Sequence, residues 1–207
     1  MSESSPLEVH VIASGSKGNC TVIKKENSVI LHDVGISCRR IVNGLKELHI
    51  DMSQVEGIFI SHEHSDHIAG LQQLLKRFDL PVYTKKETWR EIQNKLIVPK
   101  HQLVELTKGS LSLGNLTVEP FSVSHDAADP IGINVFAGKD KATVVTDTGV
   151  ITDTILRCLD DTTLLVLEAN YDPHMLRFGP YQPFLKQRVT SDEGHLSNEM
   201  AAQALLM

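Results

Sequence analysis

The stretch GIFISHEHSDHIAGL, residues 57–71, runs from an apolar segment with strand character directly into a segment with helical spacing. Between the two segments, residues 62–67 carry three imidazoles and two carboxylates. His62 and His64 are two residues apart and share one face of an extended chain. Asp66 and His67 follow at the expected turn and can address a second ion. Because so many polar groups would be costly to bury alone, the stretch predicts a site for two metal ions.

Other candidate ligands lie where further β-rich runs end. His125 follows an apolar run and could supply a third imidazole to the first ion. Asp147 ends a β-branched run, where it could bridge two ions ~3.5 to 4 Å apart or instead cap the next helix. Asp33, also at the end of such a run, could orient a metal-binding side chain without binding the metal itself. Imidazoles and carboxylates together suit Zn2+, Mn2+ or iron, so the metal's identity stays open.

Around this site the chain alternates between short β-rich runs and segments with helical spacing, without repeats or linkers. We expect strands at residues 9–13, 29–33, 57–61, 81–84, 116–122, 131–137, 142–146 and 163–169. We expect helices at residues 37–48, 68–78, 86–96, 152–159 and 196–207. A length of 207 residues suits one large core. The prediction is therefore an α/β fold with one domain over residues 7–207, preceded by a flexible N-terminus at residues 1–6.

Composition and charge argue against three classes of protein: those that bind nucleic acid through a broad basic surface, those built on disulfides, and those that span a membrane. The formal charge of −6 provides no global basic surface that would attract nucleic acid, so an anionic substrate must be held locally. The small basic clusters are interpreted as solvated faces: Lys24 with Lys25, Arg39 with Arg40, Lys85 with Lys86, and Lys186 with Arg188. Three cysteines are too few for a disulfide framework. Without a leader pattern or an apolar run of about 18 residues, we expect a cytoplasmic protein that does not enter a membrane.

The HxHxDH motif at residues 62–67 resembles the signature of the metallo-β-lactamase superfamily. Segments along nearly the whole chain are similar to its YycJ/WalJ branch: ASGSKGNC at 13–20, SHDAADPIG at 124–132, TDTG at 146–149, EANYD at 168–172, MLRFGPYQPFLKQRV at 175–189 and GHLSN at 194–198. That branch is similar to the tRNase Z and RNase J hydrolases. The resemblance implies an αββα sandwich that cleaves a nucleic-acid phosphodiester, with DNA exonuclease action as the usual suggestion.

The resemblance also implies a role for each matching residue. The first metal would be bound by His62, His64 and His125, the second by Asp66 and His67, with Asp147 as the bridge. Glu168 and His195 resemble a pair that assists protonation of the leaving group, so Asp66, Glu168 and His195 are the expected catalytic residues. A carboxylate raises the pKa of an imidazole and keeps it available as an acid.

Substrate contacts are expected from two further segments. The loop at residues 14–19 contains two glycines together with Ser14, Ser16 and Asn19, which could line a substrate groove. Asn170 could hydrogen-bond a nucleotide's backbone. Both segments are expected to contact nucleic acid, either DNA or RNA.

The C-terminal end departs from the family's pattern. Similar proteins continue past GHLSN with another strand and a further histidine that binds the second metal, whereas this chain ends at Met207. We therefore expect a domain truncated at its C-terminus. The second metal would keep Asp66, His67 and Asp147 as ligands, unless His195 shifts to bind it.

The leading functional hypothesis is a phosphodiesterase or nuclease, in which a hydroxide bridging two divalent ions attacks phosphorus. One alternative is a thioester or amide hydrolase of the same fold, as in glyoxalase II or β-lactamases. The other is a metal-binding protein without activity, which the incomplete second site favours. The pair of Glu168 and His195 favours phosphodiesters.

Overall fold

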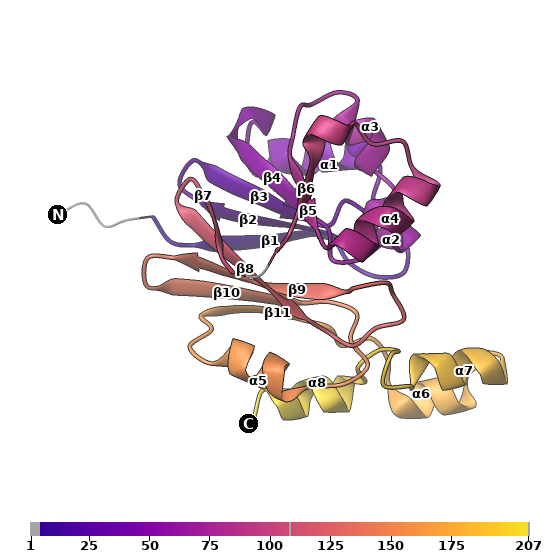
Figure 1. The fold of residues 1–207 in the computed structure, drawn as a ribbon. Helices are drawn as coiled ribbons and strands as arrows, with labels where there is room; N and C mark the ends of the chain where they lie inside the picture. The colour runs from indigo at the N-terminus through magenta and orange to yellow at the C-terminus, as the bar shows by residue number, and fades with distance from the viewer. Residues whose placement is uncertain (1–4, 108, 207) are drawn as a thin grey trace.

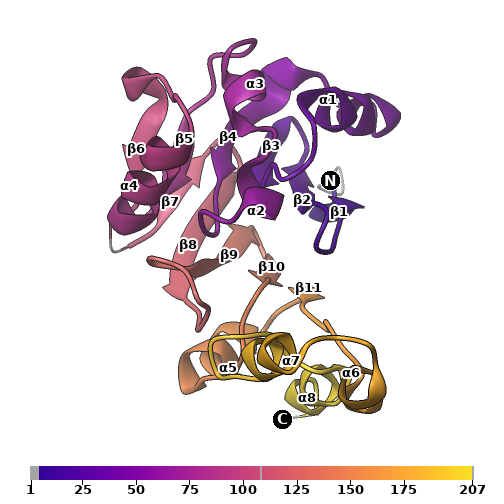
Figure 2. The same ribbon diagram turned by 90° about the vertical axis from the view of Figure 1, so that its right-hand side faces the viewer.

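Two β-sheets lie face to face, and helices cover the outer side of each (Figures 1 and 2). This computed structural model describes residues 5–107 and 109–206. Residues 1–4 of the predicted flexible N-terminus therefore lie outside the described residues, and residues 5 and 6 are exposed without regular structure. The layers are helix, sheet, sheet, helix, which confirms the predicted α/β sandwich.

The first sheet is formed by the N-terminal half of the chain. Its strands, in spatial order, are β1 (Glu8–Ala13), β2 (Cys20–Lys25), β3 (Ser28–His32), β4 (Val55–Phe59), β5 (Val82–Thr84) and β6 (Leu103–Glu105). The pairs from β1 to β3 are antiparallel, whereas those from β3 to β6 are parallel. Parallel strands are usually buried on both faces, and β3 is buried at every residue.

The second sheet follows along the chain. Its strands, in spatial order, are β11 (Leu164–Leu167), β10 (Asp140–Val145), β9 (Ile131–Ala137), β8 (Leu116–Ser122) and β7 (Leu111–Leu113). All neighbours are antiparallel except β10 and β11, which are parallel. Strands β8 and β10 are both antiparallel to β9, so β8, β10 and β11 end at the same edge of the sheet.

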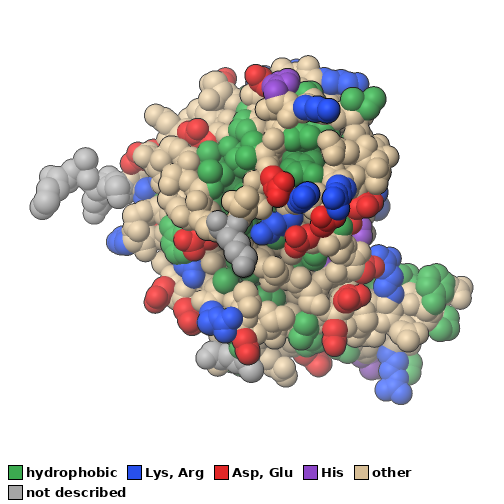
Figure 3. Space-filling model, in the orientation of Figure 1, with side chains coloured by type: hydrophobic (Ala, Val, Ile, Leu, Met, Phe, Trp, Pro, Cys, Tyr) green, Lys and Arg blue, Asp and Glu red, His purple; other side chains and the backbone are tan. Residues whose placement is uncertain are grey.

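Helices cover the outer faces in two groups (Figure 2). Those on the first sheet are α1 (Cys38–Glu47), α2 (Ser65–Ile68), α3 (Leu71–Leu75) and α4 (Lys86–Lys95). Those on the second side are α5 (Asp153–Leu159), α6 (Pro173–Phe178), α7 (Pro183–Val189) and α8 (Asn198–Ala204). Helices α6 and α7 project from the body and carry exposed apolar side chains, Met175, Phe178 and Phe184 among them (Figures 1 and 3). Within the described parts of the chain, no helix is both long and apolar enough to span a bilayer.

Alternating side chains of the same strands build two apolar layers. Ile30 of β3 and Phe59 of β4 pack between the sheets, whereas their neighbours Leu31 and Ile58 pack under the helices. All four are fully buried. This alternation follows from the pleat of a strand, and it fixes each strand against both layers.

The polar ends of five strands meet at one edge of the sandwich. Asp33 follows β3, and residues 61–67 follow β4, which is parallel to β3. On the second sheet, His125, Asp147 and Glu168 follow β8, β10 and β11. The rigid core therefore positions these side chains, which lie in the segments that directly follow its strands, including the short helix α2.

Candidate metal centre

Three imidazoles form the first group of candidate ligands. His62 Nε2 lies 3.1 Å from His64 Nδ1, and one nitrogen of each of these rings and of His125 lies within 4.8 Å of the others. His62 and His125 are buried, and His64 is partly exposed. Burial holds the pKa of His62 well below its usual range. The ring is therefore neutral, which is the form that binds a metal.

A second group joins His67 to two carboxylates. Its Nε2 lies 2.6 Å from Asp147 Oδ2 and 3.6 Å from Asp66 Oδ2. The same Asp147 oxygen lies 3.7 Å from His62 Nε2, so Asp147 stands between the two groups. Its backbone has a φ of 47°, a left-handed conformation that aspartate tolerates better than most residues. The structure thus brings all six predicted metal-binding side chains together.

In three of the imidazole rings, the Nδ1 atom contacts an oxygen atom of the protein. His62 Nδ1 contacts Ser61 Oγ at 2.9 Å, His67 Nδ1 contacts Asp33 Oδ2 at 2.7 Å, and His125 Nδ1 contacts the carbonyl oxygen of Gly194 at 3.0 Å. Each contact leaves Nε2 as the nitrogen available to a ligand. Imidazole ligands of protein metals are usually oriented in this way. The nitrogen and oxygen donors of this centre therefore fit divalent cations such as Zn2+ or Mn2+.

Asp33 is fully buried and supports both groups. Its carboxylate accepts hydrogen bonds from the backbone N–H and the hydroxyl of Ser61, in addition to its contact with His67. Burial alone would raise the pKa of Asp33, but electrostatic interactions with the imidazoles of His67 and His32 and the hydrogen bond from His67 lower it to about 2. Asp33 is therefore ionised, and it fixes the orientation of His67.

Replacing Asp33 with asparagine should weaken metal binding without removing a ligand. The amide cannot match the charge that orients His67, and loss of such a partner typically costs about 10- to 100-fold in metal affinity. Titration with a chromophoric chelator as competitor measures this affinity. The matched control is Asp79→Asn, because the Asp79 side chain is exposed and pairs with His101 on the surface. Equal affinities in the two variants would refute this role of Asp33.

Glu168 and His195 lie at the other side of Asp147. Glu168 Oε1 is 2.6 Å from His195 Nδ1, and Asp147 Oδ1 is 3.3 Å from the same nitrogen. Glu168 Oε2 accepts hydrogen bonds from the backbone N–H groups of Thr148 and Leu196. Burial lowers the pKa of His195, but hydrogen bonds to Asp147 and Glu168 outweigh it and raise the value to about 10. The predicted pair is thus assembled, with a protonated imidazole at neutral pH.

Two of the four predicted substrate residues touch this centre. Asn19 Nδ2 lies 3.1 Å from His67 Nε2 and 3.5 Å from Asp66 Oδ2. Asn170 donates a hydrogen bond to Glu168 Oε1 at 3.2 Å. Ser14 and Ser16 are exposed on the loop between β1 and β2, and within the described residues neither hydrogen-bonds the centre.

Three supporting groups were not predicted from the sequence. Ser61 contacts the imidazoles of both His62 and His67. The carbonyl of Gly194 holds a third ring, and Asp126 Oδ1 lies 3.3 Å from His125 Nε2. Ser61 and Asp126 each adjoin a predicted ligand in the sequence, so adjacency is the signal that could have found them.

Gly35 allows the turn that carries Asp66 to pack against the loop after β3. A Cβ atom at Gly35 would collide with the backbone carbonyl of Asp66. Gly35→Ala should therefore displace this turn and lower the free energy of unfolding by about 1 to 3 kcal/mol, as overpacking does. Chemical denaturation measures the change. The control is Gly44→Ala, where the three nearest atoms all belong to the adjustable side chain of Ile12. An unchanged midpoint for Gly35→Ala would contradict the prediction.

A family model described as a beta-lactamase superfamily domain matches residues 30–207. The chain is 36% identical over 201 residues to Exodeoxyribonuclease YycJ of Bacillus anthracis, covering 96% of this chain and 76% of that protein. It is 33% identical over 201 residues to Exodeoxyribonuclease WalJ of Streptococcus pneumoniae, covering 95% of this chain and 74% of that protein. The relatives thus share most of their length with this chain.

Solved structures share the fold at lower sequence identity. The metallo-beta-lactamase fold protein YhfI from Bacillus subtilis superposes with a TM-score of 0.73 at 19% identity, over 96% of this chain and 80% of that protein. This similarity concerns the arrangement of the two sheets and their helices.

Proposed function

The chain belongs to the beta-lactamase superfamily, and on this premise we propose that it is a metal-dependent nuclease that hydrolyses phosphodiester bonds. One observation carries the proposal. A cluster of imidazoles and carboxylates suited to divalent cations lies beside the Glu168 and His195 pair, with Asp147 contacting both. A metal cluster alone does not select the bond to be broken, but an adjacent proton donor suits an alkoxide leaving group.

We assign the metal-binding roles as follows. One divalent cation would be held by His62, His64 and His125, and a second by Asp66 and His67, with Asp147 between them. When bound, such a pair of cations activates water and stabilises the charge that develops on a phosphodiester. Zn2+ and Mn2+ suit this donor set best, and iron is also compatible.

His195 would supply the proton to the leaving oxygen. Its Nδ1 is held by Glu168 and Asp147, which leaves the Nε2–H group to face a substrate. As the phosphorus–oxygen bond breaks, the proton passes from Nε2 to the departing oxygen, and the carboxylates keep the ring oriented. Residues 7–207 would serve this function as one domain, because both sheets contribute ligands.

We further propose DNA as the substrate, because two relatives that match 96% and 95% of this chain are named as exodeoxyribonucleases. The test uses protein loaded with Mn2+ or Zn2+ and three substrates: bis-p-nitrophenyl phosphate, end-labelled DNA and a thioester. We expect turnover of both phosphodiesters and none of the thioester. Hydrolysis of the thioester alone, or no hydrolysis by fully loaded protein, would overturn the proposal.

A further inference from the structure

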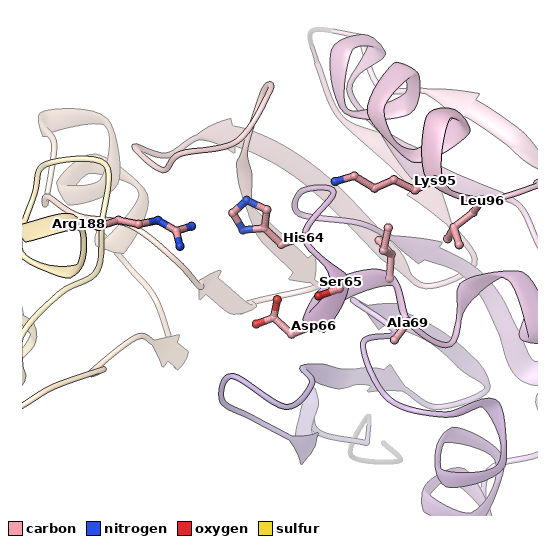
Figure 4. A pocket seen from close by; sticks show the side chains of 8 residues that line it. His64, Ser65, Asp66, Ala69, Lys95, Leu96 and Arg188 are labelled. Carbon is pink, nitrogen blue, oxygen red and sulfur yellow. The ribbon is translucent and has the colours of Figure 1, made fainter. Parts of the chain in front are cut away.

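A cleft of about 490 Å³ opens beside the candidate metal centre. The motif residues His64, Ser65 and Asp66 line this cleft. Lys95, at the end of α4, and Arg188, on α7, approach His64 from opposite sides (Figure 4). Two helices from opposite layers of the sandwich therefore bring a cation to each side of the centre.

Within residues 5–107 and 109–206, both cations keep hydrogen-bond donors that no protein group accepts. Lys95 is exposed and donates to the carbonyl oxygen of Glu63 at 3.1 Å, and an ammonium has three donors. Arg188 contacts Asp126 Oδ2 through Nε at 2.7 Å and Nη2 at 2.6 Å, while its side chain remains 59% exposed. A guanidinium has five N–H donors, so several remain directed to solvent.

Apolar side chains complete the cleft between these charges. Ile68 at the end of α2 and Ala69 directly after it line the cleft together with Leu96. A site with cations on opposite sides and an apolar surface between them matches a nucleotide, which combines charged phosphates with the flat face of a base and the carbon face of a sugar. Because the net charge of the chain is −6, such local cations are needed to hold a polyanion.

We propose that this cleft binds the nucleotide next to the scissile phosphodiester, with Lys95 and Arg188 holding phosphate oxygens on its two sides. This inference rests on the proposed function, since it places the strand across the same centre. Leu96, which is partly exposed, packs against the sugar or base. Lys95 thereby distinguishes a DNA strand from a small ester that cannot reach across the cleft.

The test measures binding of a fluorescein-labelled single-stranded oligodeoxynucleotide to metal-free protein by anisotropy, over a range of salt concentrations. Lys95→Gln should weaken binding about five-fold, as loss of one exposed ion pair does. It should also reduce the slope of log K against log salt by about 0.7, the value for one phosphate contact with a single strand. Lys95→Arg should restore both quantities. With metal-loaded protein, Lys95→Gln should lower the ratio of kcat/KM for DNA to that for bis-p-nitrophenyl phosphate by a similar factor.

The control is Lys86→Gln, which removes the same charge from the other end of α4, outside the cleft. It should bind the oligonucleotide as the wild type does. Equal losses in the two variants would indicate general electrostatics and overturn the proposal, as would wild-type binding by Lys95→Gln. A different result would separate the two proposals. If Lys95→Gln binds DNA more weakly but the metal-loaded wild type hydrolyses no phosphodiester, the cleft binds DNA as proposed and the proposed nuclease activity is refuted.

Discussion

Asp147→Asn is expected to lower hydrolysis of DNA and of bis-p-nitrophenyl phosphate alike, by about 10³-fold or more. Asp147 contacts His67, His62 and His195, so it joins both ligand groups to the proton donor. A neutral amide cannot bridge two cations. Loss of the bridging carboxylate should therefore lower activity by more than the about 10- to 100-fold that follows from losing a residue that only orients a ligand. Asparagine also tolerates the left-handed backbone at this position, so the fold should persist.

Asp161→Asn provides a matched control for this prediction. Asp161 also has a left-handed backbone, with a φ of 57°, but it is exposed after α5 and away from the centre. It should retain wild-type kcat/KM on both substrates. Residual activity of Asp147→Asn within ten-fold of the wild type would contradict the bridging role.

His195→Gln is expected to separate the two substrates. General acid catalysis typically contributes about 10²- to 10⁴-fold, so kcat on DNA should fall within that range. p-Nitrophenolate leaves without protonation, and turnover of bis-p-nitrophenyl phosphate should therefore fall far less. Steady-state kinetics with both substrates on metal-loaded protein measures the difference.

The control for His195→Gln is His101→Gln. His101 also contacts a carboxylate, Asp79, at 3.1 Å, but both side chains are mostly exposed. This variant should behave as the wild type does. Equal losses of His195→Gln on the two substrates would indicate that His195 acts on the metal centre rather than as the proton donor.

The sequence predicts those strands that are long and consistently apolar. Strands β8 and β9 coincide with the predicted residues 116–122 and 131–137. The sequence does not predict β2, because its residues CTVIKK mix apolar side chains with two lysines and depend on pairing with β1 and β3. Strands β6 and β7 have three residues each, too few to display a period.

The helices differ from prediction where tertiary contacts or exposure override the local pattern. The helix predicted over residues 68–78 is shorter in the structure, where α3 spans only Leu71–Leu75 and Ile68 ends the separate α2; Gly70, between them, packs against the carbonyls of Val34 and Ile36. Helix α2 begins at Ser65, so Asp66 and His67 lie on its first turn rather than in an open loop. The sequence does not predict α6 and α7, because these helices are short and leave Met175, Phe178 and Phe184 exposed instead of forming one continuous buried face.

The sequence predicts those ligands of the candidate centre that come directly after an apolar strand. His125 and Asp147 could be placed beside the HxHxDH motif because all three segments leave apolar strands at one edge. The positions of the Gly194 carbonyl and the Arg188 guanidinium could not be predicted from the sequence, because both depend on how α7 and the turn after it pack against the loop after β8. In the basic cluster of Lys186 and Arg188, interpreted as a solvated face, the Arg188 side chain is 59% exposed and also lines the cleft.

Metal content per chain tests the central claim most directly. Protein loaded with Zn2+ or Mn2+ is dialysed extensively and analysed by plasma mass spectrometry, alongside Asp147→Asn and Asp161→Asn. We predict about two ions per chain for the wild type and for Asp161→Asn, and a clear loss in Asp147→Asn. No bound metal in the wild type, or the same content in Asp147→Asn, would contradict a two-cation centre bridged by Asp147.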